Sequence, residues 1–365
     1  MSNQPIRAGV IGLGVGRNHA KAYRESPDSR LVALCDANEI RLNEMADELN
    51  VPSEGRYTDY TDMLAKANLD LVSVCLPNAL HPVAAIAALQ AGVHVLCEKP
   101  MASAIAEAQQ MLDAAESNQR RLMVSYNYRY RPDSQWMYHM VQTGKLGQIH
   151  HVNATWRREI GIPGWGLFGS KAMSGGGALI DLGVHVLDLA LWMMDFPAVK
   201  TVSGQARTLF AKDSQKTWGR TKGQTWDSFD VDDGAVGFLR LANGASMVLQ
   251  ATWAEHTEPQ EDRVRVELQG TEGTVVFDMG NYTKEDTLRY YTEIEDEPVT
   301  VIPKVRWGKV WGHQGLVYDA IAVVMGSDGN PPDGQQGLVA VQVLEALYQS
   351  SELGREVALE PVLSQ

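Results

Sequence analysis

The sequence predicts an α/β protein: a doubly wound parallel sheet, then an α/β domain with a large, open-faced, mainly antiparallel sheet. Two observations support this division. Up to about residue 126, short apolar strands alternate with helical segments, a pattern typical of parallel βαβ units. From residue 148 onward, the strands are joined by tight turns such as Asn243-Gly244, which are typical of antiparallel hairpins.

Composition and charge are those of an ordinary globular protein. The chain has 365 residues, enough for two cores, and 44% of them are hydrophobic. Its formal net charge of −13 would repel nucleic acid and anionic membranes, so we expect neither as a partner. The polar N-terminus runs directly into the first strand without a signal peptide, and no run of 18 apolar residues exists, so we expect a cytoplasmic protein. Three cysteines lie in apolar runs, and we expect buried thiols at Cys35, Cys75 and Cys97.

A glycine-rich turn follows the first predicted strand, 7–11, and precedes a helix that starts near Arg17. Glycines in such a turn let the backbone approach a pyrophosphate, and the helix N-terminus faces the phosphate charge. The spacing is GxGxG, because Arg17 occupies the sixth position of the longer GxGxxG form. We expect a dinucleotide to bind at the turn, which consists of Gly12, Leu13, Gly14, Val15 and Gly16.

The second predicted strand, 31–35, ends at Asp36. A carboxylate there can accept hydrogen bonds from both ribose hydroxyls of the adenosine half, and it would repel a 2′-phosphate. Asp36 therefore favours NAD over NADP. The alternative is that Asp36 caps the helix that starts near Glu39.

The alternation of strands and helices continues to residue 125. Helices are expected over 39–49, 61–67, 81–91 and 103–117, and strands over 69–76, 93–97 and 122–125. The strand 93–97 ends in Glu98-Lys99-Pro100, and proline cannot continue a sheet ladder. Ligands of open α/β sheets bind beyond the carboxyl ends of the strands, so Lys99 stands where a cofactor and a substrate could meet.

The run Pro77-Asn78-x-x-His81, followed by Gly92-x-His94 and Glu98-Lys99-Pro100, resembles the glucose–fructose oxidoreductase and inositol dehydrogenase family, written Gfo/Idh/MocA. The resemblance covers nearly the whole chain, although the glycine turn is shorter than the common family form. It implies a Rossmann domain over 1–126 and a substrate-binding and oligomerisation domain over 127–365, whose last helix can return to the first domain. It also implies a homodimer or homotetramer, a cis Lys99–Pro100 bond, and cofactor contacts from Pro77, Asn78, His81, Glu98, Lys99 and Asn127.

The second half is expected to contain hairpins and a few helices. Strands are expected over 148–157, 199–208, 233–241, 245–252, 264–269 and 274–278. Helices are expected over 132–142, 313–325 and 335–353. We expect the polar segment 211–228 to be a mobile loop.

The segment Gly175–Asp188 begins with three glycines and has helical apolar spacing from Leu179 onward. Asp181 and His185 stand four residues apart, which places them on one face of a helix. In the Gfo/Idh/MocA family, a matching helix enters the Rossmann cleft, and its Asp and His join the lysine at the substrate hydroxyl. Taken alone, His185 would be a core histidine and Asp181 the partner of a buried cation. No third ligand of suitable spacing accompanies them, so we expect no metal.

Together, the motifs predict an NAD-dependent dehydrogenase of a sugar, a cyclitol or a sugar derivative. His185 would accept the hydroxyl proton, Lys99 would stabilise the substrate oxygen, and Asp181 would orient the groups. Within the enzyme class, the alternative is a reductase or a dihydrodiol-type dehydrogenase. Outside it, the alternative is a catalytically silent NAD-binding sensor, which has no need of a proton-transfer set.

Weaker candidates flank these motifs. Asn127 and Arg129 follow the last strand of the first domain, where the family carries an Asn-x-Arg element, although Arg129 equally suits an interdomain ion pair. Arg157, Arg158 and Trp165 precede the Asp181 helix. An aromatic face with hydrogen-bonding cations suits a polyhydroxylated ring, while the alternative is packing beneath the loop 162–168.

Overall fold

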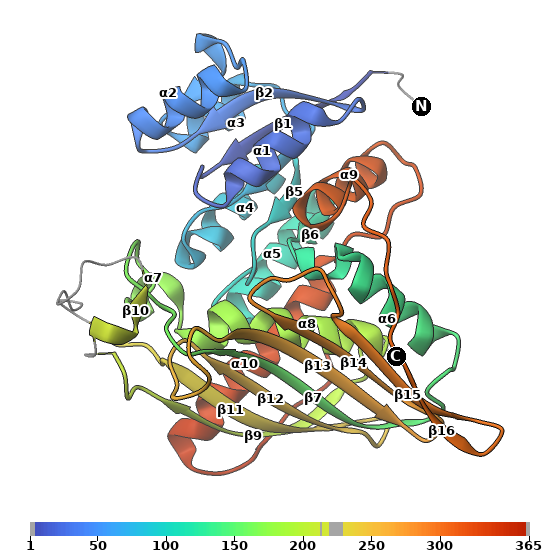
Figure 1. The fold of residues 1–365 in the computed structure, drawn as a ribbon. Coiled ribbons are helices and arrows are strands. Elements are labelled where there is room, and N and C mark those ends of the chain that lie inside the picture. The colour runs from blue at the N-terminus through green and yellow to red at the C-terminus, as the bar shows by residue number, and fades with distance from the viewer. Residues whose placement is uncertain (1–3, 212–213, 219–228, 363–365) are drawn as a thin grey trace. The chain divides into compact units, whose positions relative to one another are not determined.

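The computed structural model describes residues 4–211, 214–218 and 229–362, so most of the predicted loop 211–228 lies outside the described residues. The chain forms two compact units (Figure 1). Unit 1 comprises residues 1–130 and 309–338, and unit 2 comprises residues 131–308 and 339–365. The segment 309–338 therefore clusters with the N-terminal residues, whereas the expected second domain, 127–365, returned to the first domain only through its last helix.

Unit 1 contains a parallel sheet with the strand order β3-β2-β1-β4-β5-β6. Its strands are β1 (Ile6–Ile11), β2 (Ser29–Cys35), β3 (Arg56–Tyr57), β4 (Leu71–Val74), β5 (His94–Cys97) and β6 (Leu122–Val124). Its helices are α1 (Gly16–Glu25), α2 (Glu39–Glu48), α3 (Tyr60–Lys66), α4 (His81–Gln90), α5 (Ile105–Ser117) and α9 (Gly312–Val324). The central strands β1, β4 and β5 are almost wholly buried, as expected for a sheet covered on both faces.

Helix α9 packs on α1, far from it in sequence, and completes the core of unit 1. The buried face of α9, Leu316, Val317, Ala320 and Ile321, joins residues of α1 and α2 in one cluster. The three cysteines are unpaired and buried, as predicted, and burial raises the pKa of each thiol.

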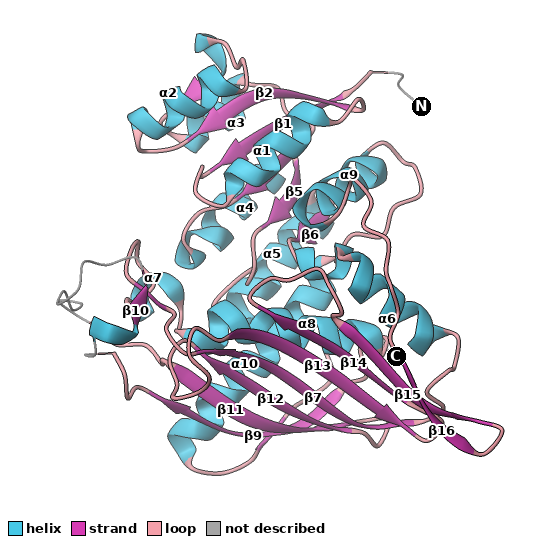
Figure 2. Ribbon diagram, viewed as in Figure 1, coloured by secondary structure: helices cyan, strands magenta, loops and turns pink. Residues whose placement is uncertain are grey.

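Unit 2 contains a mixed sheet with the strand order β16-β15-β14-β13-β7-β12-β11-β9-β17 (Figure 2). Its strands are β7 (Ile149–Arg158), β9 (Val199–Arg207), β11 (Gly234–Leu241), β12 (Ser246–Thr252), β13 (Asp262–Gly270), β14 (Thr274–Gly280), β15 (Leu288–Ile294), β16 (Glu297–Val301) and β17 (Val357–Ala358). All described pairs in this sheet are antiparallel except β7 with β12. A separate short sheet pairs β8 (Ile162–Pro163) with β10 (Thr217–Trp218).

The helices of unit 2 are α6 (Pro132–Gln142), α7 (Lys171–Ser174), α8 (Val184–Met193) and most of α10 (Gly334–Leu353). Helix α8 packs on β7 and β13, and α6 packs on β14. Along β7, buried residues alternate with half-buried ones, so only one face of this strand is covered. The stretch Lys171–Met193 is long and apolar enough to cross a membrane, but 89% of its apolar 18-residue window is buried inside the protein, as in a core helix.

The fold class is therefore as predicted, and most predicted elements lie within a few residues of the observed ones. The sequence analysis missed β15 and β16, whose residues are mostly exposed or half-buried and lack strict alternation. It also missed the very short strands β3, β8, β10 and β17.

Candidate active site

The glycine turn of unit 1 fits the approach of a phosphate group. Gly12 has a φ of +88°, and a Cβ there would stand 2.4 Å from the carbonyl oxygen of Cys75, so only glycine fits. At Gly14, no described heavy atom lies within 4 Å of such a Cβ, and Gly14 and Val15 are exposed. Helix α1 begins at Gly16. The backbone at Gly14 is thus open to a ligand, and the helix N-terminus follows it.

Asp36 lies at the end of β2 and contacts the same turn. Its Oδ2 accepts hydrogen bonds from the backbone N–H of Leu13, at 2.9 Å, and from Arg41, at 3.2 Å. Its Oδ1 accepts from the N–H of Asn38, at 2.8 Å. The cap of helix α2 is Asn38, whose side chain accepts from the N–H of Arg41, so Asp36 is not the helix cap that the alternative interpretation required.

Glu98, which follows β5, is the centre of a buried polar cluster. Its Oε1 lies 3.0 Å from Nε2 of His19 on α1 and 3.7 Å from Nε2 of His313 on α9. Burial would raise the pKa of Glu98, but the hydrogen bond from His19 and the charges of its neighbours outweigh burial, so its pKa lies far below the usual range. Desolvation lowers the pKa of His313 to about 4. The cluster therefore places a carboxylate anion directly before Lys99.

The ligand atoms of His19, Glu98 and His313 lie within 4.8 Å of one another, a spacing that could hold a metal ion. These groups also have protein partners. Nδ1 of His19 lies 2.9 Å from Oγ of Ser73, and Nδ1 of His313 lies 3.4 Å from Nδ2 of Asn127. The cluster is thus satisfied as a network of protein groups.

The Lys99–Pro100 peptide bond is cis, as the family resemblance implied. His81, at the start of α4, lies under this turn: its ring nitrogens are 2.8 Å from the carbonyl oxygens of Pro100 and Leu76. His81 is 1% exposed, so its side chain supports the turn from within the protein. Pro77 is exposed and precedes the short helix Asn78–Leu80, and Asn78 is half-buried. Lys99 is partly exposed, and its N–H donates to Oε2 of Glu98 at 3.1 Å.

In unit 2, the predicted Asp181 helix contains a π-helical turn, Leu179–Gly183, which continues as α8. Between residues 176 and 191, all of which the structure describes, Asp181 and His185 are the only two that are not buried. They therefore share the accessible side of an otherwise buried helix, as predicted. π-Helical turns are rare and occur often at functional sites.

Aromatic rings hold both side chains. The indole N–H of Trp253, which is fully buried, donates to Oδ2 of Asp181 at 3.0 Å. The ring of His185 lies 5.5 Å from the ring of Trp156 on β7. Beside Trp156, Arg158 is paired with Asp262 at 2.8 Å. Burial would lower the pKa of Arg158, but its partners, Asp181 among them, raise it further above its usual value.

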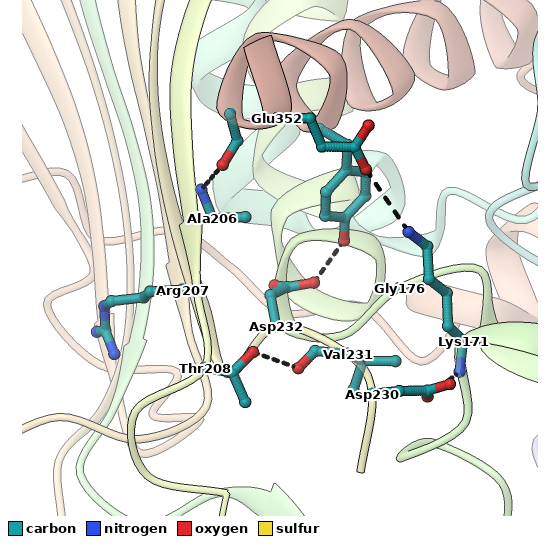
Figure 3. Close-up of a pocket in the computed structure, with 11 residues that line it drawn as sticks. Lys171, Gly176, Ala206, Arg207, Thr208, Asp230, Val231, Asp232 and Glu352 are labelled. Atoms are coloured by element: carbon teal, nitrogen blue, oxygen red, sulfur yellow. Dashed lines mark hydrogen bonds and ion pairs between the residues drawn. The ribbon is translucent and has the colours of Figure 1, made fainter. Parts of the chain in front are cut away.

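The turn that carries Asp181 is held at its start by Asp232, which also lines the cavity drawn in Figure 3. Oδ1 of Asp232 accepts from the N–H of Gly177, at 2.7 Å, and from the hydroxyl of Tyr348 on α10, at 2.6 Å. Its Oδ2 accepts from the N–H of Leu179, at 3.0 Å. A Cβ on Gly177 would stand 1.7 Å from the backbone oxygen of Asp232, so glycine is required there. A cavity of about 210 Å³ lies beside this contact, lined by Lys171, Arg207 and Glu352 among others.

Tyr348→Phe is expected to lower the free energy of unfolding by about 1–2 kcal/mol, because Asp232 loses one donor to its buried carboxylate. Tyr290→Phe is the matched control, since its hydroxyl donates to the exposed carbonyl of Lys145. The control should change the free energy by less than about 0.5 kcal/mol. Urea unfolding followed by circular dichroism measures both, and equal effects would show that the hydrogen bond from Tyr348 to Asp232 does not stabilise the fold.

The weaker candidates of the sequence differ in their surroundings. Asn127 approaches His313, as described above, while Arg129 is 4% exposed and donates to Gln336 at 2.7 Å within unit 1. Arg157 lies on the opposite face of β7 from Trp156, and its guanidinium is 3.6 Å from Glu261. Arg158, and not Arg157, therefore lies on the face of β7 that carries Trp156. Trp165 is 46% exposed and contacts Trp218.

Sequence reasoning missed Trp156, Trp218, Trp253, Asp232 and His313. The alternation of β7 could have pointed to Trp156, because it stands an even number of residues from buried Val152 and Ala154. The other four come from segments far from Asp181 or Glu98 in sequence, and no local pattern marks them.

Residues 6–126 match the family model "Oxidoreductase family, NAD-binding Rossmann fold", and residues 134–276 match the "GFO/IDH/MocA C-terminal domain". The chain belongs to the Gfo/Idh/MocA family. This assignment confirms the family resemblance, the fold class and the prediction of an enzyme. The Gfo/Idh/MocA member described here is an NAD(P)-dependent oxidoreductase, and its cofactor is a nicotinamide dinucleotide.

Curated and solved proteins agree with the family assignment. The chain is 32% identical to the D-glucoside 3-dehydrogenase of Escherichia coli (strain K12), over 98% of this chain and 99% of that protein. An oxidoreductase domain protein from Kribbella flavida has a TM-score of 0.84 at 27% identity, covering 98% of this chain and 100% of that one. A levoglucosan dehydrogenase solved with NADH has a TM-score of 0.82 at 25% identity, with the same coverage.

Proposed function

We propose that this family member transfers a hydride between NAD and a CH–OH carbon of a sugar, a cyclitol or a sugar derivative. The observation that carries the proposal is its set of polar groups: Lys99 beside an anionic Glu98, and Asp181 with His185 on the accessible side of a buried helix. Relatives named D-glucoside 3-dehydrogenase, levoglucosan dehydrogenase and myo-inositol 2-dehydrogenase support the substrate class.

The proposed mechanism assigns one task to each group. NAD, when bound, supplies the hydride acceptor. His185 accepts the proton of the substrate hydroxyl. The ammonium of Lys99 donates a hydrogen bond to the same oxygen and stabilises the negative charge that develops there. Asp181, oriented by the indole of Trp253, positions a substrate hydroxyl or the imidazole. In the reductive direction the same groups act in reverse.

The substrate class is tested by screening purified protein with NAD⁺ against a panel of aldoses, glycosides and inositols. We expect the absorbance of the reduced nicotinamide to grow with at least one member of the panel. Tight NAD binding without turnover across the panel would overturn the proposal and favour the sensor interpretation. A crystal of the complex with NAD⁺ and the best substrate then tests whether Lys99 and His185 reach one oxygen.

We further propose that NAD is preferred over NADP, because Asp36 would repel a 2′-phosphate. The position of Arg41 adds to the proposed preference for NAD. Arg41 is half-exposed and paired with Asp36, so removing the carboxylate charge would free a guanidinium for a phosphate.

Asp36→Asn is expected to lower kcat/KM with NAD about tenfold or more, since a charged hydrogen bond to the ribose is lost. The asparagine oxygen can still accept from Leu13, so the turn should persist. The ratio of kcat/KM with NADP to that with NAD should rise. Adding Arg41→Ala should cancel the gain with NADP. An unchanged ratio in Asp36→Asn would refute the role of this carboxylate.

A further inference from the structure

A continuous series of aromatic contacts in unit 2 begins at Asp181. Trp253 donates to Asp181, and its ring lies 6.4 Å from Phe168 at an interplanar angle of 82°. Phe168 lies 6.3 Å from Trp165, and Trp165 lies 5.3 Å from Trp218 at 78°. Edge-to-face contacts at these distances are favourable for aromatic pairs. The series therefore runs from a proposed catalytic carboxylate out to two indoles.

Arg158 connects the outer end of this series to the ring that contacts His185. The guanidinium of Arg158 lies 5.9 Å from the ring of Trp218 and 5.3 Å from the ring of Trp156, which contacts His185. Arg158 is 7% exposed and bonded to Asp262 and to the hydroxyl of Tyr282. Its charge is thus compensated within the protein.

Trp165 and Trp218 differ from the other rings of the series in exposure. They are 46% and 53% exposed, while Trp253 and Trp156 are buried. Ile160 and Leu167, in the same loop as Trp165, are 44% and 48% exposed. A cluster of large exposed apolar side chains marks a binding surface more often than single ones do.

Backbone pairing holds the two indoles in place. Trp218 pairs with Pro163 in the short sheet of β8 and β10, and the N–H of Gly164 donates to the carbonyl of Trp218 at 2.8 Å. Lys216, two residues earlier, donates to the carbonyl of Glu255 and lies 3.5 Å from the carboxylate of Glu159. The rings are therefore preorganised, which lowers the entropy that a ligand must offset.

We propose that Trp165 and Trp218 form an aromatic subsite for a second ring of the substrate, joined by a glycosidic bond to the sugar that is oxidised. This inference rests on the proposed function and deepens it. An uncharged ring with an apolar face matches the apolar faces of two exposed indoles. Both a second sugar ring and an aryl group are uncharged rings with an apolar face. The preferred substrate is thus a glycoside with two rings, not a free monosaccharide.

The test compares one-ring and two-ring glycosides of the same sugar: a methyl glycoside, a disaccharide and a phenyl glycoside. In Trp165→Ala and Trp218→Ala, kcat/KM for the two-ring substrates should fall about tenfold, mainly through KM. The value for the methyl glycoside should change less than about twofold. Whichever two-ring substrate loses more identifies the source of the second ring. Equal losses with one-ring and two-ring substrates would overturn the proposal.

Tyr291→Ala is the matched control, because Tyr291 is 43% exposed on β15 and belongs to neither site. It should leave all three values unchanged. A binding assay separates this proposal from the proposed function: a disaccharide or phenyl glycoside should quench tryptophan fluorescence, and the double variant should lose the quench. Quenching without turnover would refute only the proposed function. No quenching of the wild-type protein by either ligand would refute the subsite.

Discussion

Lys99→Met is expected to lower kcat about 10²–10³-fold, the usual loss when a donor to a developing oxyanion is removed. The dissociation constant of NAD⁺ should change less than about threefold. The reason lies in the surroundings of Lys99. Its backbone is held by the N–H that donates to Glu98 and by His81 beneath the Pro100 turn, and neither contact involves the ammonium. The measurements are steady-state kinetics and calorimetric titration with NAD⁺.

Lys99→Arg serves as the control for this prediction. It keeps a positive donor at the end of β5 but moves it outward, so it should recover only part of the lost activity. An undiminished kcat in Lys99→Met would refute the assignment of the ammonium. A large loss of NAD⁺ affinity would assign Lys99 to cofactor binding instead.

His185→Gln is expected to lower kcat about 10²–10⁴-fold in the direction of alcohol oxidation, the usual loss for a general base. The base must be deprotonated to act, so activity of the unmodified enzyme should rise with pH. Glutamine does not titrate, so the variant should lose this rise. The pH dependence of kcat/KM over pH 5–9 measures it.

Asp181→Asn is the companion of His185→Gln. The amide can still accept the hydrogen bond of Trp253, so the side chain should stay in place. If Asp181 only orients, this variant should lose less activity than His185→Gln and should keep the rise with pH. Persistence of the rise in His185→Gln would show that another group accepts the proton.

The sequence predicted the parallel sheet, the strand-end position of Lys99 and the placement of Asp181 and His185 on one face of a helix, because each depends on local periodicity. The alternation that marks Trp156 also places Arg158, and not Arg157, on the helix side of β7, so this choice was open to sequence reasoning. The π-helical turn could not be predicted, because apolar spacing is similar in α- and π-helical turns.

Contacts between segments that are distant in sequence could not be predicted from local patterns. His313 meets Glu98 only because α9 returns to unit 1, and no pattern within α9 marks that return. The identity of the helix cap was a closer case. Asp and Asn are both favourable helix caps. Asn38 has the extended backbone of a cap residue, and its side chain accepts from the N–H of Arg41, so Asn38 is the cap.

Asp232, Tyr348 and Trp253 hold the Asp181 turn, while Trp218 lies on β10 and Trp165 lies two residues beyond β8. Residues 165–167 are exposed, whereas Ile160 pairs with Ala254, directly after Trp253. We therefore expect that residues 165–167 can be exchanged for those of a relative while the Asp181 turn keeps its supports. Such a division lets one scaffold acquire new specificities through loop replacement, and it makes this loop the first target for redesigning substrate choice.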